Sequence, residues 1–226
     1  MGPLVEVADT RPYVEERGDR PAFPVLVFHG GPGLDHTWFG DYLDPLTEGG
    51  RYRLVLVDER ACGRSDRTVP RQTWTLDQMA QDVSGLAASL GVHDGYARLG
   101  HSHGAFVVLQ HAVDHPGEPR GTIVAAGIAA ARWLKQVERQ LAAFEPAVLR
   151  EQVTSSWARE TEVQTQDEAA ALIQDQLPFH FREPQGAALQ DYRRRTAGLA
   201  RYAPRLSATS PRRTTGESTS STGSAR

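Results

Sequence analysis

The sequence has one cysteine, one lysine and no long apolar run. A lone cysteine, Cys62, excludes an internal disulfide and is typical of proteins in a reducing compartment. Lys135 is the only lysine among 25 basic residues, and the arginines are scattered rather than gathered in a basic segment. No stretch is apolar enough to span a bilayer or to form a signal-peptide core. We therefore expect a cytoplasmic protein without membrane or nucleic-acid partners.

The composition fits an ordinary globular enzyme or binding protein. A length of 226 residues is enough for one α/β domain with a buried core. The formal net charge of −3 indicates neither an acidic nor a basic partner, and nothing in it fixes an oligomeric state.

Apolar runs and helix-like segments alternate through the first half of the chain. Continuous apolar runs suit parallel strands that are covered on both faces, and this alternation predicts right-handed crossovers in a mostly parallel sheet. A short hairpin, Leu4–Val7 with Tyr13–Glu15, is expected at a sheet edge. The predicted strands are Pro24–Phe28, Tyr52–Val57, Tyr96–Leu99 and Thr122–Ala126, and the predicted helices are His36–Leu46 (with Asp35 as N-cap), Thr75–Leu90 and Ala105–His115.

The second half of the chain has no strand-like run. Its helical patterns predict an all-helical cap over residues 130–204, beside an α/β core over residues 1–129. Residues 205–226 are rich in Ser, Thr, Gly and Arg and are expected to be a disordered tail, because they offer too little apolar surface to offset the entropy of ordering.

A Gly-x-Ser-x-Gly motif occupies Gly100 to Gly104, between a predicted strand and a predicted helix. A serine at such a strand-to-helix turn stands exposed above the sheet, and the flanking glycines let neighbouring backbone pass closely. Ser102 is therefore the candidate nucleophile. The plainer alternative is an ordinary turn serine.

The run His29-Gly30-Gly31-Pro32-Gly33 follows the first buried strand. Glycines there free backbone N–H groups to face a ligand, so the N–H groups of Gly31 and His103 are the predicted oxyanion hole, with His29 and Gly30 as further binding candidates. The alternatives are a plain turn or a phosphate loop, and the second lacks the required lysine.

No metal site or cofactor is expected. The histidines His29, His101 and His103 have no carboxylate or cysteine at metal-ligand spacing. Asp58 and Arg60 are expected to pair with nearby backbone and hold their loop, and Cys62 to be a small packing residue.

Three motifs together resemble the proline iminopeptidase branch of the α/β-hydrolase fold. They are His29–Gly33, Asp58-Glu59-Arg60-Ala61-Cys62-Gly63-Arg64-Ser65-Asp66, and Gly100–Gly104, in the order and spacing of that family. The resemblance implies a serine hydrolase that forms an acyl-enzyme and releases N-terminal proline from a small or short peptide substrate. It also implies acidic cap residues that hold the substrate's amino group, for which the candidates are Glu160, Glu162 and Glu183.

The chain departs from that family in several places. Ala61 and Ala105 stand where the family has glycine, and His103 stands where it has tryptophan. No triad Asp or His is recognisable after Ser102, and the last strands of the sheet are absent from the pattern. The downstream histidines, His103, His111, His115 and His180, all lie outside the expected motif.

These absences suggest a truncated or frameshifted hydrolase, with the change near residue 205 and with poor solubility from an exposed sheet edge. Two other functions remain open. One is an esterase or lactonase-type hydrolase of a small substrate. The other is a catalytically inactive fragment or ligand-binding relative that keeps the pocket without the triad.

Overall fold

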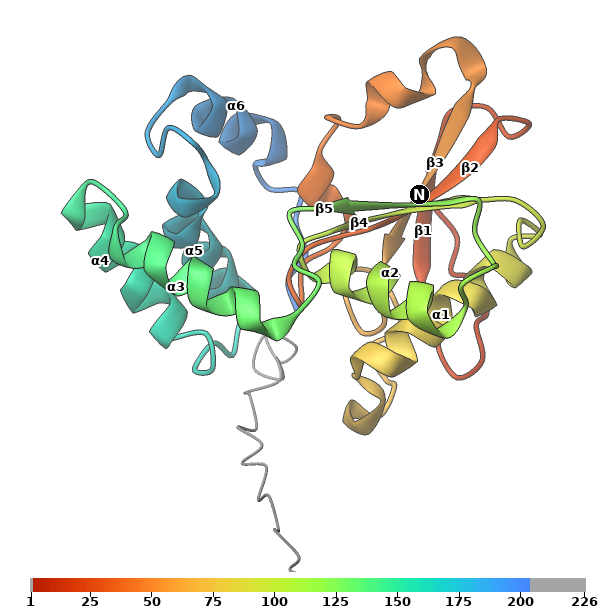
Figure 1. The fold of residues 1–226 in the computed structure, drawn as a ribbon, viewed down its shortest axis with the longest axis horizontal. Helices are drawn as coiled ribbons and strands as arrows, with labels where there is room; N and C mark the ends of the chain where they lie inside the picture. The colour runs from red at the N-terminus through yellow and green to blue at the C-terminus, as the bar shows by residue number, and fades with distance from the viewer. Residues whose placement is uncertain (1, 204–226) are drawn as a thin grey trace, which may run out of the picture.

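The computed structural model describes residues 2–203, and its centre is a five-stranded sheet (Figure 1). The strand order is β1-β3-β2-β4-β5, with β1 antiparallel to β3 and every other pair parallel. This confirms the predicted α/β class with a mostly parallel sheet. The strands are β1 (Tyr13–Arg17), β2 (Phe23–Phe28), β3 (Tyr52–Asp58), β4 (Ala97–His101) and β5 (Gly121–Ala125).

The sheet is buried because its central strands are apolar on both faces. Leu26 and Val55 are fully buried on one face, which α1 (Leu76–Ser89) and α2 (His103–Asp114) cover. Both helices begin and end within about two residues of their predicted bounds. The side chain of Thr75 caps α1 by accepting the N–H of Gln78.

The predicted helix over residues 36–46 is wrong. The segment forms two short 3₁₀ turns, η1 (His36–Phe39) and η2 (Asp44–Gly50), which lie against the other face of the sheet. Gly40, with a φ of 52°, ends the first turn, and the second begins at Asp44 with Pro45 as its next residue. Asp35 is the N-cap as predicted, since its carboxylate accepts the N–H of Thr37.

The predicted hairpin is only partly present. Leu4 makes a single bridge to Tyr13, and Val7 makes one to Thr10. Elsewhere, a third short 3₁₀ turn, η3 (Arg71–Thr73), precedes α1. The main pairing of β1 is with β3, at the edge of the sheet as expected.

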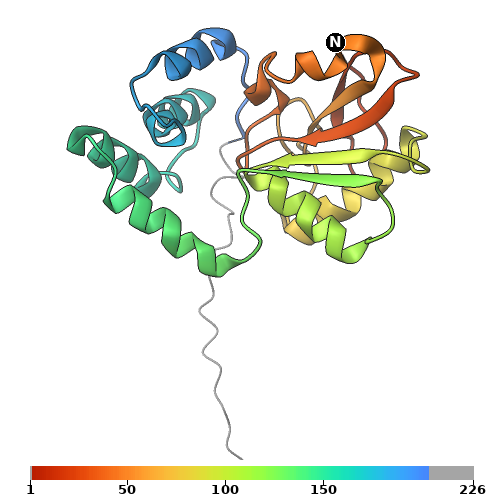
Figure 2. The same ribbon diagram turned by 45° about the horizontal axis from the view of Figure 1, so that its top comes forward.

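Residues after β5 are helical, and no strand follows β5 within residues 2–203. Figures 1 and 2 show these helices as a separate group beside the sheet. In cap helix α6, Tyr192 donates to the carbonyl of Trp38 at 2.8 Å, and Arg195 pairs with Asp41. The helical elements are η4 (Ala131–Trp133), α3 (Leu134–Ala142), α4 (Ala147–Ala158), α5 (Gln166–Gln176), η5 (Leu177–His180) and α6 (Ala187–Thr196).

A short return segment, residues 200–203, brings the chain back from α6 to the core. The N–H of Arg201 donates to Asp35 Oδ2 at 2.9 Å, and the N–H of Ala203 donates to the carbonyl of Gly33 at 2.7 Å. The segment therefore lies beside the glycine loop. The tail predicted over residues 205–226 lies outside the described residues. No helix within residues 2–203 is long and apolar enough to cross a lipid bilayer.

Strand β5 is a sheet edge with exposed apolar side chains. Ile123 is 49% exposed and Val124 is 42% exposed, and β5 has only β4 as a neighbour among the described strands. Edges of this kind pair with other chains and promote aggregation.

Replacement of Ile123 by lysine should therefore reduce aggregation, because a charge at the middle of an edge strand disfavours edge-to-edge pairing. Static light scattering of the purified chain measures the effect. Val148→Lys is the matched control, because Val148 is 65% exposed on cap helix α4, away from the sheet. Equal improvement in both variants would show that added charge, and not the edge, is responsible.

Candidate active site

Ser102 lies at a strained turn between β4 and α2. Its φ of 53° and ψ of −110° are unusual for a residue with a Cβ. The surrounding backbone fixes this conformation, since the N–H of Ser102 donates to Ala125 at 2.9 Å and its carbonyl accepts the N–H of Ala105 at 3.1 Å. The turn holds the serine at the carboxyl end of β4, where the sequence places it.

The two glycines of the motif are required by close backbone contacts. A Cβ on Gly100 would lie 2.1 Å from the carbonyl oxygen of Gly104, and a Cβ on Gly104 would lie 2.5 Å from the carbonyl oxygen of Phe28. The N–H of Gly104 also donates to the carbonyl of His29 at 2.8 Å. The serine turn and the glycine loop therefore form one unit.

The glycine loop passes directly beside the serine. A Cβ on Gly30 would lie 3.3 Å from Ser102 Cβ, and Gly31 has a φ of 131°, which favours glycine. The N–H of His103 is one of the unpaired donors at the start of α2, and neither it nor the N–H of Gly31 has an acceptor within residues 2–203. The two donors proposed for the oxyanion are thus free to bind a ligand.

His29 supports this loop instead of facing a ligand. It is fully buried, its Nδ1 donates to the carbonyl of Gly30 at 2.7 Å, and its Nε2 accepts the N–H of Glu59 at 3.1 Å. Gly30, by contrast, lines the cavity described below.

Asp58 holds its loop as predicted. Its carboxylate accepts the N–H groups of His36 and Arg64, both at 2.8 Å, and bonds His36 Nδ1 at 2.6 Å. Burial alone would raise the pKa of Asp58, but the hydrogen bonds from His36 and the charges of His36 and His29 together outweigh burial, and the pKa is lowered. Burial opposes the charge on His36 too, yet the Asp58 carboxylate raises its pKa.

The expectation for Arg60 is wrong. Its buried guanidinium binds two carboxylates and not backbone: Asp82 through two hydrogen bonds of 2.8 and 2.7 Å, and Asp9 at 2.8 Å. Cys62 is a fully buried packing residue as predicted, and burial raises the pKa of its thiol. Ala61 has a φ of 61°, which explains why the similar family has glycine there.

Ser102 opens into a cavity of about 240 Å³ between the glycine loop and the cap. Its walls are mainly apolar, including Trp38 and Trp157, with a few polar groups on opposite sides. Burial raises the pKa of Tyr202 to about 12, which keeps its hydroxyl protonated at neutral pH. The polar side chains of the wall come from Ser102, His101, Glu160, Gln176, His180 and Tyr202.

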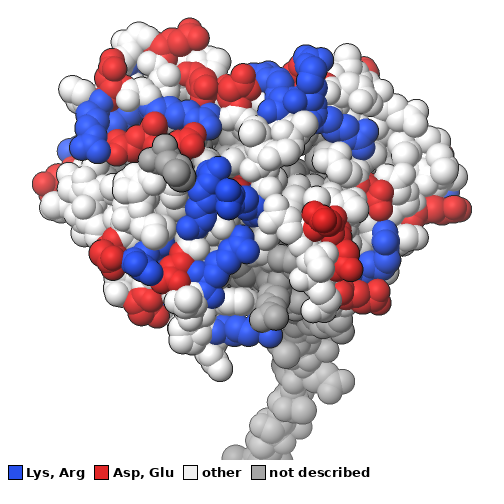
Figure 3. Space-filling view, turned by 180° about the vertical axis from the view of Figure 1, so that it is seen from behind, with Lys and Arg blue, Asp and Glu red and all other residues white. Residues whose placement is uncertain are grey.

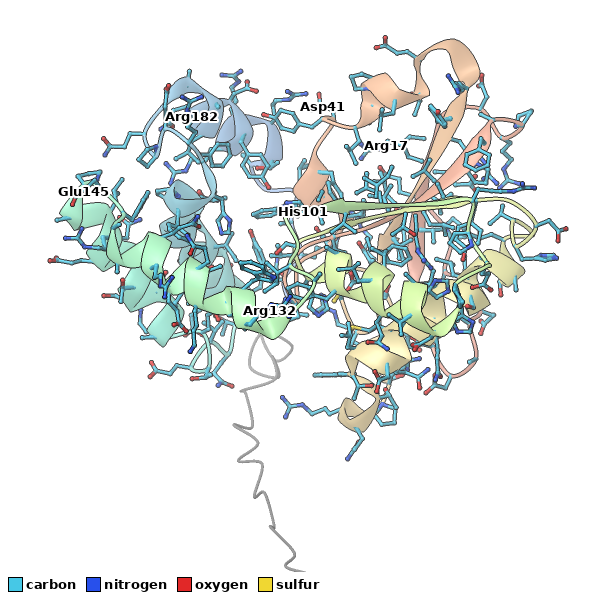
Figure 4. All side chains as sticks on the ribbon, in the orientation of Figure 1. Arg17, Asp41, His101, Arg132, Glu145 and Arg182 are labelled. Atoms are coloured by element: carbon cyan, nitrogen blue, oxygen red, sulfur yellow. The ribbon has the colours of Figure 1, made fainter. Side chains whose placement is uncertain are left out.

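The two histidines that flank Ser102 point apart. His103 turns toward Glu59, with its Nδ1 3.1 Å from the carboxylate, while His101 lines the cavity at the junction of sheet and cap (Figure 4). Burial lowers the pKa of His101, as do the nearby His180 and His29, and burial lowers that of His180. His101 and His180 are therefore neutral at pH 7.

No imidazole within residues 2–203 is hydrogen-bonded to the Ser102 hydroxyl. His111, on the helix behind the serine, instead bonds Ser84 at 2.8 Å and Glu118 at 2.7 Å. Of the three histidines that follow His103 in the sequence, His180 lines the cavity, whereas His111 and His115 do not. The described residues thus contain the candidate nucleophile and the unpaired N–H groups without a Ser–His–acid relay.

Of the three acidic cap candidates, only Glu160 lines the cavity. Glu162 and Glu183 are exposed elsewhere on the cap. Gln176 donates to Glu160 Oε1 at 2.9 Å. Burial raises the pKa of Glu160, and this hydrogen bond offsets part of the rise.

Two buried clusters have the spacing of metal ligands, His29 with Glu59 and Cys62, and Asp35 with His36 and Asp58. In the first, both nitrogens of His29 are already engaged by the backbone of Gly30 and Glu59. In the second, His36 and Asp58 are bonded to each other. Both clusters are consistent with structural hydrogen-bond networks.

The sequence matches the family model for the alpha/beta hydrolase fold over residues 24–206. It is 29% identical over 119 residues to the proline iminopeptidase of Saccharolobus solfataricus. The aligned segment covers 52% of this chain and 37% of that relative. Another proline iminopeptidase, from Lactiplantibacillus plantarum, is 28% identical over 59% of this chain and 47% of its own length. The matched segments span less than half of these curated relatives.

Two solved structures are also similar. VinJ has a TM-score of 0.62 and 26% identity, covering 77% of this chain and 59% of that one. The proline iminopeptidase of Mycobacterium smegmatis has a TM-score of 0.58, with 86% of this chain and 60% of that one covered. At 24% identity, the second likeness concerns the fold alone.

Proposed function

The chain belongs to the α/β-hydrolase fold family, and from this we propose that it is a serine hydrolase in which Ser102 is the nucleophile. The observation that carries the proposal is the strained Ser102 turn, which lies against a glycine loop with free N–H groups and opens into a cavity. Such a turn is costly to fold and suits a serine that must stand clear of its neighbours.

In the proposed reaction, Ser102 Oγ attacks a substrate carbonyl and forms an acyl-enzyme. The N–H groups of Gly31 and His103 stabilise the negative oxygen of the tetrahedral intermediate, and water then releases the acid. Since no base contacts Oγ within residues 2–203, these residues alone should accelerate the reaction by about 10³- to 10⁴-fold over water, as for other serine hydrolases that lack a triad member.

The substrate we propose is a small peptide or amide with a free amino group, because the relatives named above are proline iminopeptidases. Glu160 is the cavity carboxylate that would hold the amino group, and Gln176 orients it. The apolar walls at Trp38 and Trp157 suit a compact, uncharged side chain such as that of proline.

Replacement of Glu160 by glutamine is expected to lower kcat/KM for amino-bearing substrates by about 10- to 100-fold, the value of a hydrogen bond to a charged group. The wild-type kcat/KM for these substrates should fall as pH drops through the raised pKa of Glu160, because the protonated acid no longer attracts an ammonium group. Kinetics against pH measure both effects. Exposed Glu162→Gln is the control, and short acyl esters without an amine should be unaffected.

A panel of proline anilides and short acyl esters tests the proposed specificity. Faster turnover of the anilides supports the aminopeptidase assignment, while turnover of esters or lactones alone makes the protein an esterase-type hydrolase. Folded protein that turns over neither class faster than buffer would support a ligand-binding or inactive relative and would contradict the hydrolase proposal.

A further inference from the structure

A second concavity lies next to the return segment, which also lines the Ser102 cavity. It is an open groove of about 590 Å³, and its wall includes Arg64, Arg67, Arg201, Ser65 and Gln166. Figure 3 shows basic side chains gathered over the middle of the face turned away from the viewer in Figure 1. Three of the groove's side chains are those of arginines, and none of the described residues that line it is acidic.

The three arginines are not neutralised by ion pairs within residues 2–203. Arg67 donates to the carbonyls of Gly63 and Tyr202, which hold its guanidinium in place without cancelling its charge. Arg64 lies over the ring of Tyr13, with its guanidinium carbon 5.1 Å from the ring centroid. Arg201 uses only its backbone N–H, toward Asp35.

Two carboxylates of the segment that carries Arg64 and Arg67 already have other partners. Asp66 pairs with Arg11 at 3.2 Å and accepts the N–H of Thr68 at 2.8 Å. Asp58 is fully buried and bonded to His36. Three arginine side chains that line one hollow favour an anion there, because their positive potentials add.

We propose that this groove binds the phosphate group of a small molecule. Planar guanidinium groups bind phosphate through paired hydrogen bonds, and a phosphate carries about −1.5 to −2 charges at pH 7, which matches several arginines better than a single carboxylate does. The site is separate from the Ser102 cavity. It shares the return segment with that cavity, because Arg201 lines the groove and Tyr202 lines the cavity.

Isothermal titration of the full chain with inorganic phosphate tests the proposal, with sodium chloride keeping the ionic strength constant. Saturable binding is expected in the wild type, and Arg67→Gln and Arg201→Gln should each weaken it at least about tenfold. Arg182→Gln is the matched control, because it removes an exposed arginine that lies on the cap (Figure 4) and does not line the groove, and it should bind as the wild type does.

Three results would overturn the phosphate site. They are the absence of saturable binding, equal binding of acetate at the same ionic strength, and an Arg182→Gln variant that loses as much affinity as the groove variants. Circular dichroism of each variant establishes that it is folded. Binding is measured without turnover, so the outcome is independent of the serine hydrolase proposal.

Discussion

Replacement of Ser102 by alanine should abolish the acyl-enzyme that an activated acyl ester forms, because Ser102 Oγ is the proposed nucleophile. The N–H groups proposed as the oxyanion hole, those of Gly31 and His103, would still assist direct attack by water, so hydrolysis should remain about 10³-fold above the rate in buffer. Intact-mass analysis after mixing with the ester measures the acyl-enzyme.

The control for this variant is Ser155→Ala, which removes an exposed hydroxyl from cap helix α4. It should form the acyl-enzyme as the wild type does. Alanine and serine both carry a Cβ, so the strain of the turn is the same in both. The fold of Ser102→Ala should therefore be unchanged, and circular dichroism can establish this. An acyl-enzyme in Ser102→Ala would mean that another residue is the nucleophile.

The largest expected effect on stability is at Asp82. Its carboxylate binds the guanidinium of Arg60 through two hydrogen bonds, and the Arg60 side chain is fully buried. Asp82→Ala leaves this charge with only the half-exposed Asp9 as an ionic partner. We expect the free energy of unfolding to fall by about 3–5 kcal/mol, as for other buried ion pairs that lose one member, and urea denaturation measures it.

Asp9→Ala is the matched control, because Asp9 binds the same guanidinium but its side chain is 50% exposed. Its loss should cost less than about 1 kcal/mol. The double variant Arg60→Met with Asp82→Leu should recover much of the stability, since it removes the stranded charge. A loss from Asp82→Ala no larger than that from Asp9→Ala would contradict the account of Arg60 as a buried charge that depends on Asp82.

Local patterns predicted the parts of the fold that depend on neighbouring residues. The apolar runs of β2 and β3, the spacing of α1 and the Gly100–Gly104 turn are each specified by a few consecutive residues. The helix predicted over residues 36–46 failed because apolar spacing there competes with Gly40 and Pro45, which break the segment into turns.

Contacts between distant segments could not be predicted in the same way. Arg60 meets Asp82 from the next helix, and nothing in the Asp58–Asp66 motif indicates that partner. His180 and Glu160 reach the cavity only because the cap folds over the ends of the strands. The departure at Ala61 was visible in the sequence, but its positive φ was not.

Labelling with a fluorophosphonate probe, followed by intact-mass and peptide analysis, tests most directly whether Ser102 is an activated nucleophile. Folded wild-type protein should gain one adduct per chain on the peptide that contains Ser102, and Ser102→Ala should gain none. Folded protein that gains no adduct, or gains one on another residue, would contradict the assignment of Ser102.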